Sequence, residues 1–303
     1  MKSYFCTNRV LAWTFTGIAI TALFFACKKD AAKNTDPVVA EQSDKQVMAG
    51  AAYQAEVDLY YSDIFDAVSA GAAQQIPDPS ARRSEGNPAL LTTPSPSCPS
   101  AYIEGGLTWP ITVNIDFGTS CSNSLNNRVR GGKIIAVFSG YLTTPGTTVK
   151  VTLQNFTING KPVSGNILYT VTGYNKEPNG GISFTQKITD GTVKLNDSII
   201  AVYNHTKTVK QTNGGSTIAN PGDDEYDTEG TGTLVYKHTN GTNVSISIST
   251  PVKLHTSWNC QWIRSGQLKL VTEMVAGTID YGAGDCDNKA TVTVGDKMKE
   301  ITL

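Results

Sequence analysis

The stretch Val244-Ser245-Ile246-Ser247-Ile248-Ser249 decides the fold class, because apolar and hydroxyl side chains alternate in it without interruption. A period of two places the two kinds of side chain on opposite faces of a β-strand. Similar alternation occurs upstream, over 149–153 and 182–188. These stretches predict an antiparallel sheet with one apolar face and one hydrated face.

Tight-turn dipeptides separate the predicted strands. Asn-Gly and Asp-Gly pairs accept the positive φ angles that two-residue hairpins require. They occur as Asn159-Gly160, Asn179-Gly180, Asp190-Gly191, Asn213-Gly214 and Asn240-Gly241. The sequence therefore predicts an all-β domain over 98–303, an antiparallel meander of about ten to twelve strands that forms a β-sandwich or a strongly twisted, curled sheet.

One helix is predicted before this domain, over 43–75. Apolar residues recur there at three- and four-residue steps, and acidic residues mostly lie off this stripe. The apolar set is Val57, Tyr61, Ile64 and Val68, and the acidic set is Glu56, Asp58, Asp63 and Asp66. We expect the helix to pack on the domain or to hang on its tether, with a partner-binding helix as the alternative.

The segments on either side of the helix are predicted to be linkers. Residues 27–42 are small and polar, which is typical of a flexible tether. Residues 76–97 are rich in proline, which blocks helix and sheet hydrogen bonds and favours an extended segment. We expect this second linker to hold the β-domain away from the membrane.

The composition excludes several classes of function. A net charge of −1, from 25 basic and 26 acidic residues, argues against nucleic-acid binding. The chain has three histidines, His205, His238 and His255, which we expect at surface or edge positions. It contains no Gly-x-Ser-x-Gly nucleophile elbow. We therefore predict no catalytic residue, no metal and no cofactor.

Two segments of the predicted domain are similar in sequence, and we call this similarity the echo. Ile115-Asp116-Phe117-Gly118 is similar to Ile279-Asp280-Tyr281-Gly282, and each lies between two cysteines. An Asp-aromatic-Gly ending is typical of a sharp turn that side-chain hydrogen bonds stabilise. Four cysteines allow three pairings, and the echo favours Cys98–Cys121 and Cys260–Cys286 in an exported chain. A zinc site would need cysteines two to four residues apart, and the sequence contains none.

The N-terminus predicts export. Lys2 and Arg9 precede an apolar run, 10–26, that is shorter than the roughly 20 residues of a membrane-spanning helix. It ends in Leu23-Phe24-Phe25-Ala26-Cys27. This ending resembles a bacterial lipobox, and the Cys-Lys-Lys-Asp that follows is similar to the start of Bacteroidota surface lipoproteins. The resemblance implies a signal peptide over 1–26, lipidation of Cys27 and an outer-membrane, cell-surface location. An uncleaved anchor or a plain secretory signal are the alternatives.

Two further groups of residues are candidates for binding. The acidic run 223–229 has the oxygen ligands that Ca²⁺ prefers, but it lacks calcium-loop spacing, so a solvated hairpin loop is the preferred interpretation. Trp109, Trp258 and Trp262 would serve either as a platform for sugar rings or, in the preferred interpretation, as core residues.

These observations predict a membrane-anchored envelope lipoprotein with a non-enzymatic structural or binding β-domain. Its expected partners are the membrane, through the N-terminal lipid, and a glycan or an envelope protein. The alternative is a glycan-binding lipoprotein of a polysaccharide-uptake system.

Overall fold

A single antiparallel sheet of 14 strands dominates the computed structural model, which describes residues 37–76, 98–122, 128–217 and 221–303. Neighbouring strands follow the chain order, and β3 pairs with β4 beside this path. The first strands are β1 (Ser100–Glu104), β2 (Ile111–Asp116), β3 (Cys121–Ser122), β4 (Val129–Phe138), β5 (Thr148–Ile158), β6 (Lys161–Asn175) and β7 (Gly181–Asn196). The others are β8 (Ile199–Asn213), β9 (Glu225–His238), β10 (Asn243–Ser257), β11 (Cys260–Val271), β12 (Ala276–Ala283), β13 (Lys289–Val294) and β14 (Lys297–Thr302).

The predicted fold class is confirmed. The chain forms an antiparallel meander with one helix, α1 (Pro37–Gln75), before it. The sheet is curled but not closed, since β1 and β14 end the strand order and do not pair with each other. It has more strands than expected because β1, β3 and β14 are short and carry little alternation.

The hairpin prediction is confirmed for four of the five dipeptides, which lie at connections between consecutive strands. Asn159 and Gly160 have φ angles of 51° and 74° and form the two-residue turn between β5 and β6. Asn179-Gly180 and Asn240-Gly241 lie in the short β6–β7 and β9–β10 connections, and Asn213-Gly214 opens the longer β8–β9 connection. The prediction for Asp190-Gly191 is wrong, because this pair lies inside β7 at a register shift against β8.

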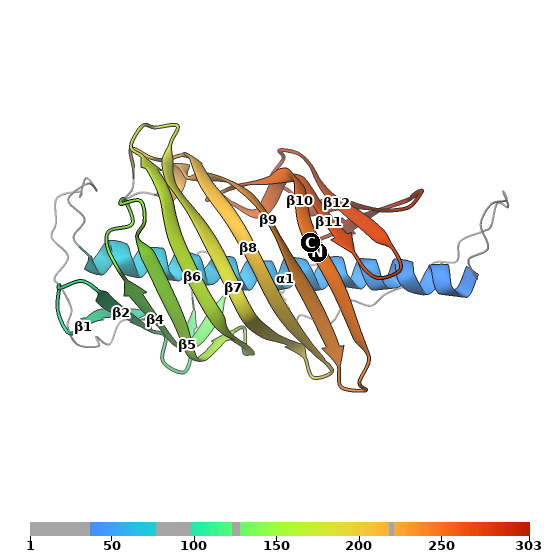
Figure 1. The fold of residues 1–303 in the computed structure, drawn as a ribbon, viewed down its shortest axis with the longest axis horizontal. Coiled ribbons are helices and arrows are strands. Elements are labelled where there is room, and N and C mark those ends of the chain that lie inside the picture. Colours follow the sequence, from blue (N-terminus) through green and yellow to red (C-terminus); the bar gives the residue numbers. More distant parts are fainter. Residues whose placement is uncertain (1–36, 77–97, 123–127, 218–220) are drawn as a thin grey trace, which may run out of the picture. The chain divides into compact units, whose positions relative to one another are not determined.

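Helix α1 lies against the inner face of the sheet, and the strands cross it obliquely (Figure 1). Its predicted apolar stripe is confirmed, because Val57, Tyr61 and Ile64 are fully buried and Val68 is nearly so. Two glycines in the helix mark close approach to strands. An added Cβ would lie 2.1 Å from Ile246 Cδ1 at Gly50 and 2.8 Å from Ile115 Cδ1 at Gly71.

The helix is therefore the core of the β-domain. Residues from Pro37 to Leu303 form one compact unit, and the core cluster runs continuously from Val47 to Val294. The helix also begins earlier than predicted, at Pro37 instead of Ser43, and proline is well tolerated in a first helical turn. Residues 37–42 thus belong to the helix and not to the tether.

This position of α1 corrects the role predicted for the proline-rich segment. Residues 77–97 lie outside the described residues, but the elements on both sides of them belong to the same compact unit. The segment therefore connects two parts of one compact unit.

Candidate functional site

Acidic side chains of α1 contact the sheet, although they lie mostly off the apolar stripe. Three of them pair with basic side chains of the sheet: Glu56 with Lys161, Asp58 with Lys207, and Asp63 with Arg128 and Arg130. The Asp63 side chain is fully buried, and Arg130 Nε donates to it at 2.6 Å. These contacts fix the helix in one register, since a buried charge is costly without its partner.

The most polar part of the interior surrounds Asp58. Tyr203 Oη donates to Asp58 at 2.7 Å, and Lys207 also contacts this carboxylate. Burial raises the pKa of Asp58, but Lys207, His205 and the hydrogen bonds outweigh it, so the pKa lies below the usual value. His205 is 5% exposed, stacks on Tyr203, and leaves Nδ1 without a hydrogen-bond partner. Its expected surface position is therefore wrong.

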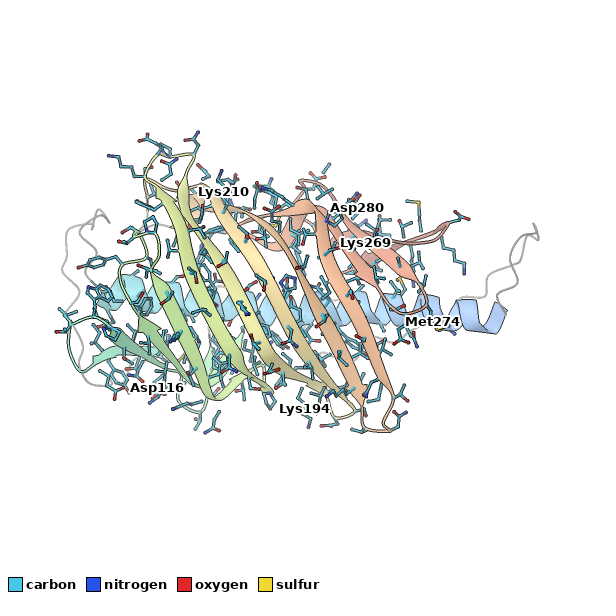
Figure 2. All side chains as sticks on the ribbon, in the orientation of Figure 1. Asp116, Lys194, Lys210, Lys269, Met274 and Asp280 are labelled. Carbon is cyan, nitrogen blue, oxygen red and sulfur yellow. A yellow bond between two sulfur atoms is a disulfide. The ribbon has the colours of Figure 1, made fainter. Side chains whose placement is uncertain are left out.

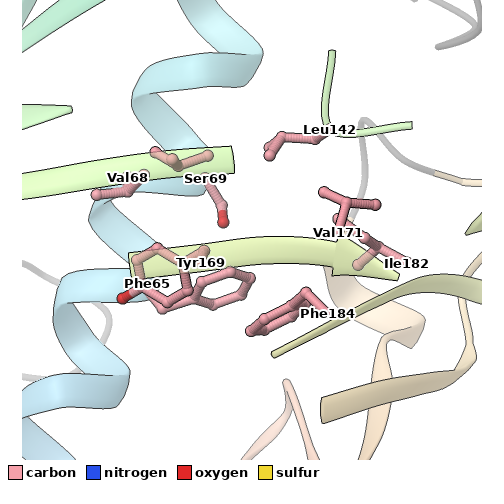
Figure 3. Close-up of a pocket in the computed structure, with 9 residues that line it drawn as sticks. Phe65, Val68, Ser69, Leu142, Tyr169, Val171, Ile182 and Phe184 are labelled. Carbon is pink, nitrogen blue, oxygen red and sulfur yellow. The ribbon is translucent and has the colours of Figure 1, made fainter. Parts of the chain in front are cut away.

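A small cavity lies between α1 and the sheet. Figure 3 shows an apolar cavity between Phe65 and Ser69 of α1 and the facing strands, lined also by Tyr169 and Phe184. Its volume is about 10 Å³, which is about the room that one water molecule needs. The Ser69 hydroxyl is buried beside it without a partner. Among the described residues, this cavity is too small for a metabolite.

The echoed segments form equivalent turns, as predicted. Asp116 Oδ1 accepts from the Gly118 amide at 2.9 Å, and Asp280 Oδ1 accepts from the Gly282 amide at 2.9 Å. The second carboxylate oxygen of each aspartate binds a side chain of the adjacent strand. These contacts are Lys133 Nζ to Asp116 Oδ2 at 3.2 Å and Gln267 Nε2 to Asp280 Oδ2 at 2.8 Å.

Disulfide bonds lie beside both turns. The structure joins Cys98 to Cys121 and Cys260 to Cys286, with Cα separations of 5.7 and 5.8 Å. This is the pairing that the echo favours. Asp287, beside the second bridge, accepts from the Lys289 amide at 3.0 Å and caps its own turn.

The acidic run 223–229 is mostly a strand, which corrects the predicted hairpin loop. From Glu225 onward it belongs to β9, and its carboxylates face basic groups of neighbouring strands. These pairs are Asp227 with His255 at 2.9 Å, Glu229 with Lys253 at 3.6 Å, and Glu225 with Arg264 at 3.7 Å. No cluster of His, Cys, Asp and Glu suited to a metal occurs among the described residues.

A polar groove at the rim of the sheet is the best candidate for a binding site. It lies where the β6–β7 turn meets β8 and has a volume of about 280 Å³. Its lining residues are Gly173, Tyr174, Asn175, Asn179, Gly180, Gly181, Ser183, Lys210 and Gln211. Figure 2 shows Lys210 at one rim of the sheet and Lys194 at the opposite rim. The lining thus combines amides, hydroxyls and one cation, and it contains no carboxylate.

Hydrogen bonds hold the floor of this groove. Gln211 is 7% exposed, accepts from the Ile182 amide at 3.0 Å and donates to Asp224 at 2.8 Å. Tyr226 Oη donates to the other oxygen of Asp224 at 2.8 Å. Burial raises the pKa of Asp224, and the Asp224 carbonyl accepts from the Trp258 amide at 2.9 Å. The groove is therefore linked to the β10–β11 turn.

The tryptophans do not form one platform. Trp109, which precedes β2, packs edge-on against Tyr141 at 4.9 Å and contacts the core. Trp262 is half-buried in β11, whereas Trp258 is 45% exposed at the β10–β11 turn. The core interpretation therefore holds for Trp109 and is wrong for Trp258.

Several sequence predictions concern residues that the structure does not describe. Cys27 and the signal peptide lie outside the described residues. Within them, no helix is both long and apolar enough to span a bilayer.

The groove itself could not be found by sequence motifs. Its residues come from three strands and one turn, so no spacing in the sequence brings them together. The only local signal is Asn179-Gly180-Gly181, which predicts a turn and says nothing of a ligand.

Comparisons with known proteins give no relative. No protein-family model matches the chain, and neither a curated protein nor a solved structure matches it significantly.

Proposed function

We propose that this protein is a membrane-tethered, non-enzymatic envelope lipoprotein that binds its partner on the outer face of its β-domain. One observation carries the proposal: α1 fills the inner face of the curled sheet, and the cavity beside it holds only about 10 Å³. The charged groups of α1 that contact the sheet are paired there, Asp58 with Lys207 and Asp63 with Arg128 and Arg130. Exposed polar side chains alternate with the core positions along the strands, and the polar groove lies at the β6–β7 turn.

The position of α1 also defines how a lipidated Cys27 would hold the domain. Ten peptide steps separate Cys27 from Pro37, where α1 begins, and they span at most about 35 Å. Because α1 belongs to the domain core, the domain would lie within that distance of the membrane surface. A short tether suits a structural protein or a receptor for material close to the membrane.

Metabolic labelling with an alkyne-tagged fatty acid tests the tether. We expect the wild-type protein to be labelled and Cys27→Ala to lose both the label and the membrane fraction. Cys6→Ala is the matched control and keeps the label. Equal labelling of Cys27→Ala and wild type would refute lipidation at Cys27. Proteinase K treatment of intact cells then separates a cell-surface location from a periplasmic one.

Glycan binding is the second candidate function, and Trp258 favours it. Its exposed side chain lies at a turn that the Cys260–Cys286 disulfide fixes, next to the polar groups of β9. Aromatic side chains with an exposed face are suited to stack on sugar rings. On a glycan array we expect Trp258→Ala to lose binding and Ile200→Ala, an exposed apolar control on β8, to keep it. Unchanged binding by Trp258→Ala would refute this role.

A further inference from the structure

The polar groove at the β6–β7 turn presents one positive charge without a protein partner. Lys210 is exposed and lines the groove, and no hydrogen bond or ion pair engages it among the described residues. Its cross-strand neighbour on β9 is Asp227, but that carboxylate is occupied by His255 Nδ1 at 2.9 Å. The charge of Lys210 is therefore available to a ligand.

We propose that this groove binds one acidic sugar residue, with the sugar carboxylate paired to Lys210. This inference rests on the proposed glycan-binding function and names its ligand class. The volume of about 280 Å³ lies just below the range of about 300–1,000 Å³ for drug-sized ligands, which favours a single ring over a larger ligand.

The neutral lining groups match the rest of such a ligand. Asn179 and Ser183 line the groove with an amide and a hydroxyl that could bind sugar hydroxyls, and neither side chain makes a hydrogen bond among the described residues. Tyr174 also lines the groove, and its hydroxyl donates to the Gly215 carbonyl at 3.3 Å. The ring is therefore held in place, as a stacking surface requires.

Two glycines keep the amides at the floor of the groove. An added Cβ would lie 2.7 Å from Asn175 Cγ at Gly180 and 2.1 Å from Gln211 Oε1 at Gly181. Any larger residue would push these side chains out of position. The floor is thus closely packed, and the groove is shaped by side chains with defined hydrogen-bond partners.

The charge pattern argues against a phosphate ligand. Phosphate sites use several cations, a bidentate arginine or a helix N-terminus. The groove has one lysine, no arginine and no helix among its lining residues. A single carboxylate on a hydroxyl-rich ring matches one lysine surrounded by amides better than a doubly charged group does.

Calorimetric titration of the full-length protein in detergent tests the proposal. The probes are trisaccharides of galacturonic, glucuronic and mannuronic acid, each compared with its methyl ester, which removes the charge and keeps the ring. We expect at least one acid to bind about tenfold more tightly than its ester, because the charge-assisted hydrogen bond is lost. Lys210→Gln should abolish this difference, whereas Lys237→Gln, an exposed lysine near the opposite end of β9, should keep it.

Two results would overturn the assignment of the groove. One is that no acid binds, and the other is that Lys210→Gln keeps the preference for the acid over the ester. If neutral glycans still bind and Trp258→Ala removes that binding, glycan binding stands and only the ligand class fails. If no glycan of either kind binds, both fail.

Discussion

Tyr61 of α1 donates a hydrogen bond of 2.8 Å to the carbonyl oxygen of Ser164 in β6, 103 residues further along the chain. The same hydroxyl lies over Gly191 of β7, where an added Cβ would come within 2.3 Å of it. The register of both strands shifts here, at Ser164/Asn166 in β6 and at Ile188/Gly191 in β7. Such irregularities bend a sheet locally. The sheet thus bends where the helix side chain enters it.

Gly191→Ala should destabilise the domain by about 2 kcal/mol or more, because the new methyl group overlaps Tyr61 Oη, Ile188 Cγ2 and the Tyr203 carbonyl. Tyr61→Phe removes one of these clashes, so the double variant should lose less than the sum of the single losses. Urea unfolding measures all three. Gly173→Ala is the control, since its Cβ would meet only Ser183, at 3.9 Å. Additive losses in the double variant would contradict the contact.

Asp63→Asn should cost about 3–5 kcal/mol of unfolding free energy, because it leaves Arg130 buried without a full counter-charge. Asp197→Asn breaks the exposed pair with Lys194 and should cost far less. Chemical denaturation of both variants gives the comparison. Equal small losses would show that the α1–sheet pairs do not hold the helix.

A fall in pH should lower the free energy of unfolding through the protonation of His205. Burial and the charge of Lys207 lower the pKa of His205 to about 4, from 6.5 in the unfolded chain. The unfolded chain therefore binds the proton first, and this contribution to stability, about 3 kcal/mol, is complete above pH 6.5 and lost as the pH falls towards 4. The lowered pKa of Asp58 acts in the same direction at still lower pH.

His205→Phe should remove this part of the pH dependence while keeping a ring against Tyr203. His238→Phe, on β9, should leave it in place. Thermal or urea unfolding between pH 7 and pH 4.5 measures how steeply the stability of each variant falls with pH. If the stability of His205→Phe falls with pH as steeply as that of the wild type, His205 does not cause this pH dependence.

Asp280→Ala and Asp116→Ala should each cost about 1 kcal/mol, because each removes the acceptor of a turn amide and of a cross-strand contact. Similar losses from the two variants would match the equivalence of the two turns. Asp287 caps a turn but makes no cross-strand contact among the described residues, so Asp287→Ala should cost less. A large loss from only one of the echoed aspartates would contradict their equivalence.

Local patterns predicted much of this fold. Strict alternation identified β10, and its apolar residues Val244, Ile246 and Ile248 are buried. The Asn159-Gly160 turn and the two aspartate-capped turns depend on residues a few positions apart, so the sequence predicts them directly. The disulfide pairing followed from the same echo.

Features that depend on distant partners could not be predicted in this way. Asp190-Gly191 has the composition of a hairpin turn, but Tyr61 and Ser164 make it a bend within a strand. The sequence gives no sign that Asp63 is buried, because the arginines that pair with it lie 65 and 67 positions away. The groove at the β6–β7 turn is also lined by residues of several strands, so the sequence gives no sign that Lys210 belongs to a site.

Hydrogen exchange followed by mass spectrometry tests most directly whether α1 is the core of the β-domain. If it is, amides over 47–72 should exchange as slowly as those of β7 and β8, because helix and sheet would then open together. Peptides of β14, an edge strand with mostly exposed side chains, serve as the fast-exchanging reference. Rapid exchange over 47–72, with the sheet still protected, would contradict the account and return α1 to the role of a tether.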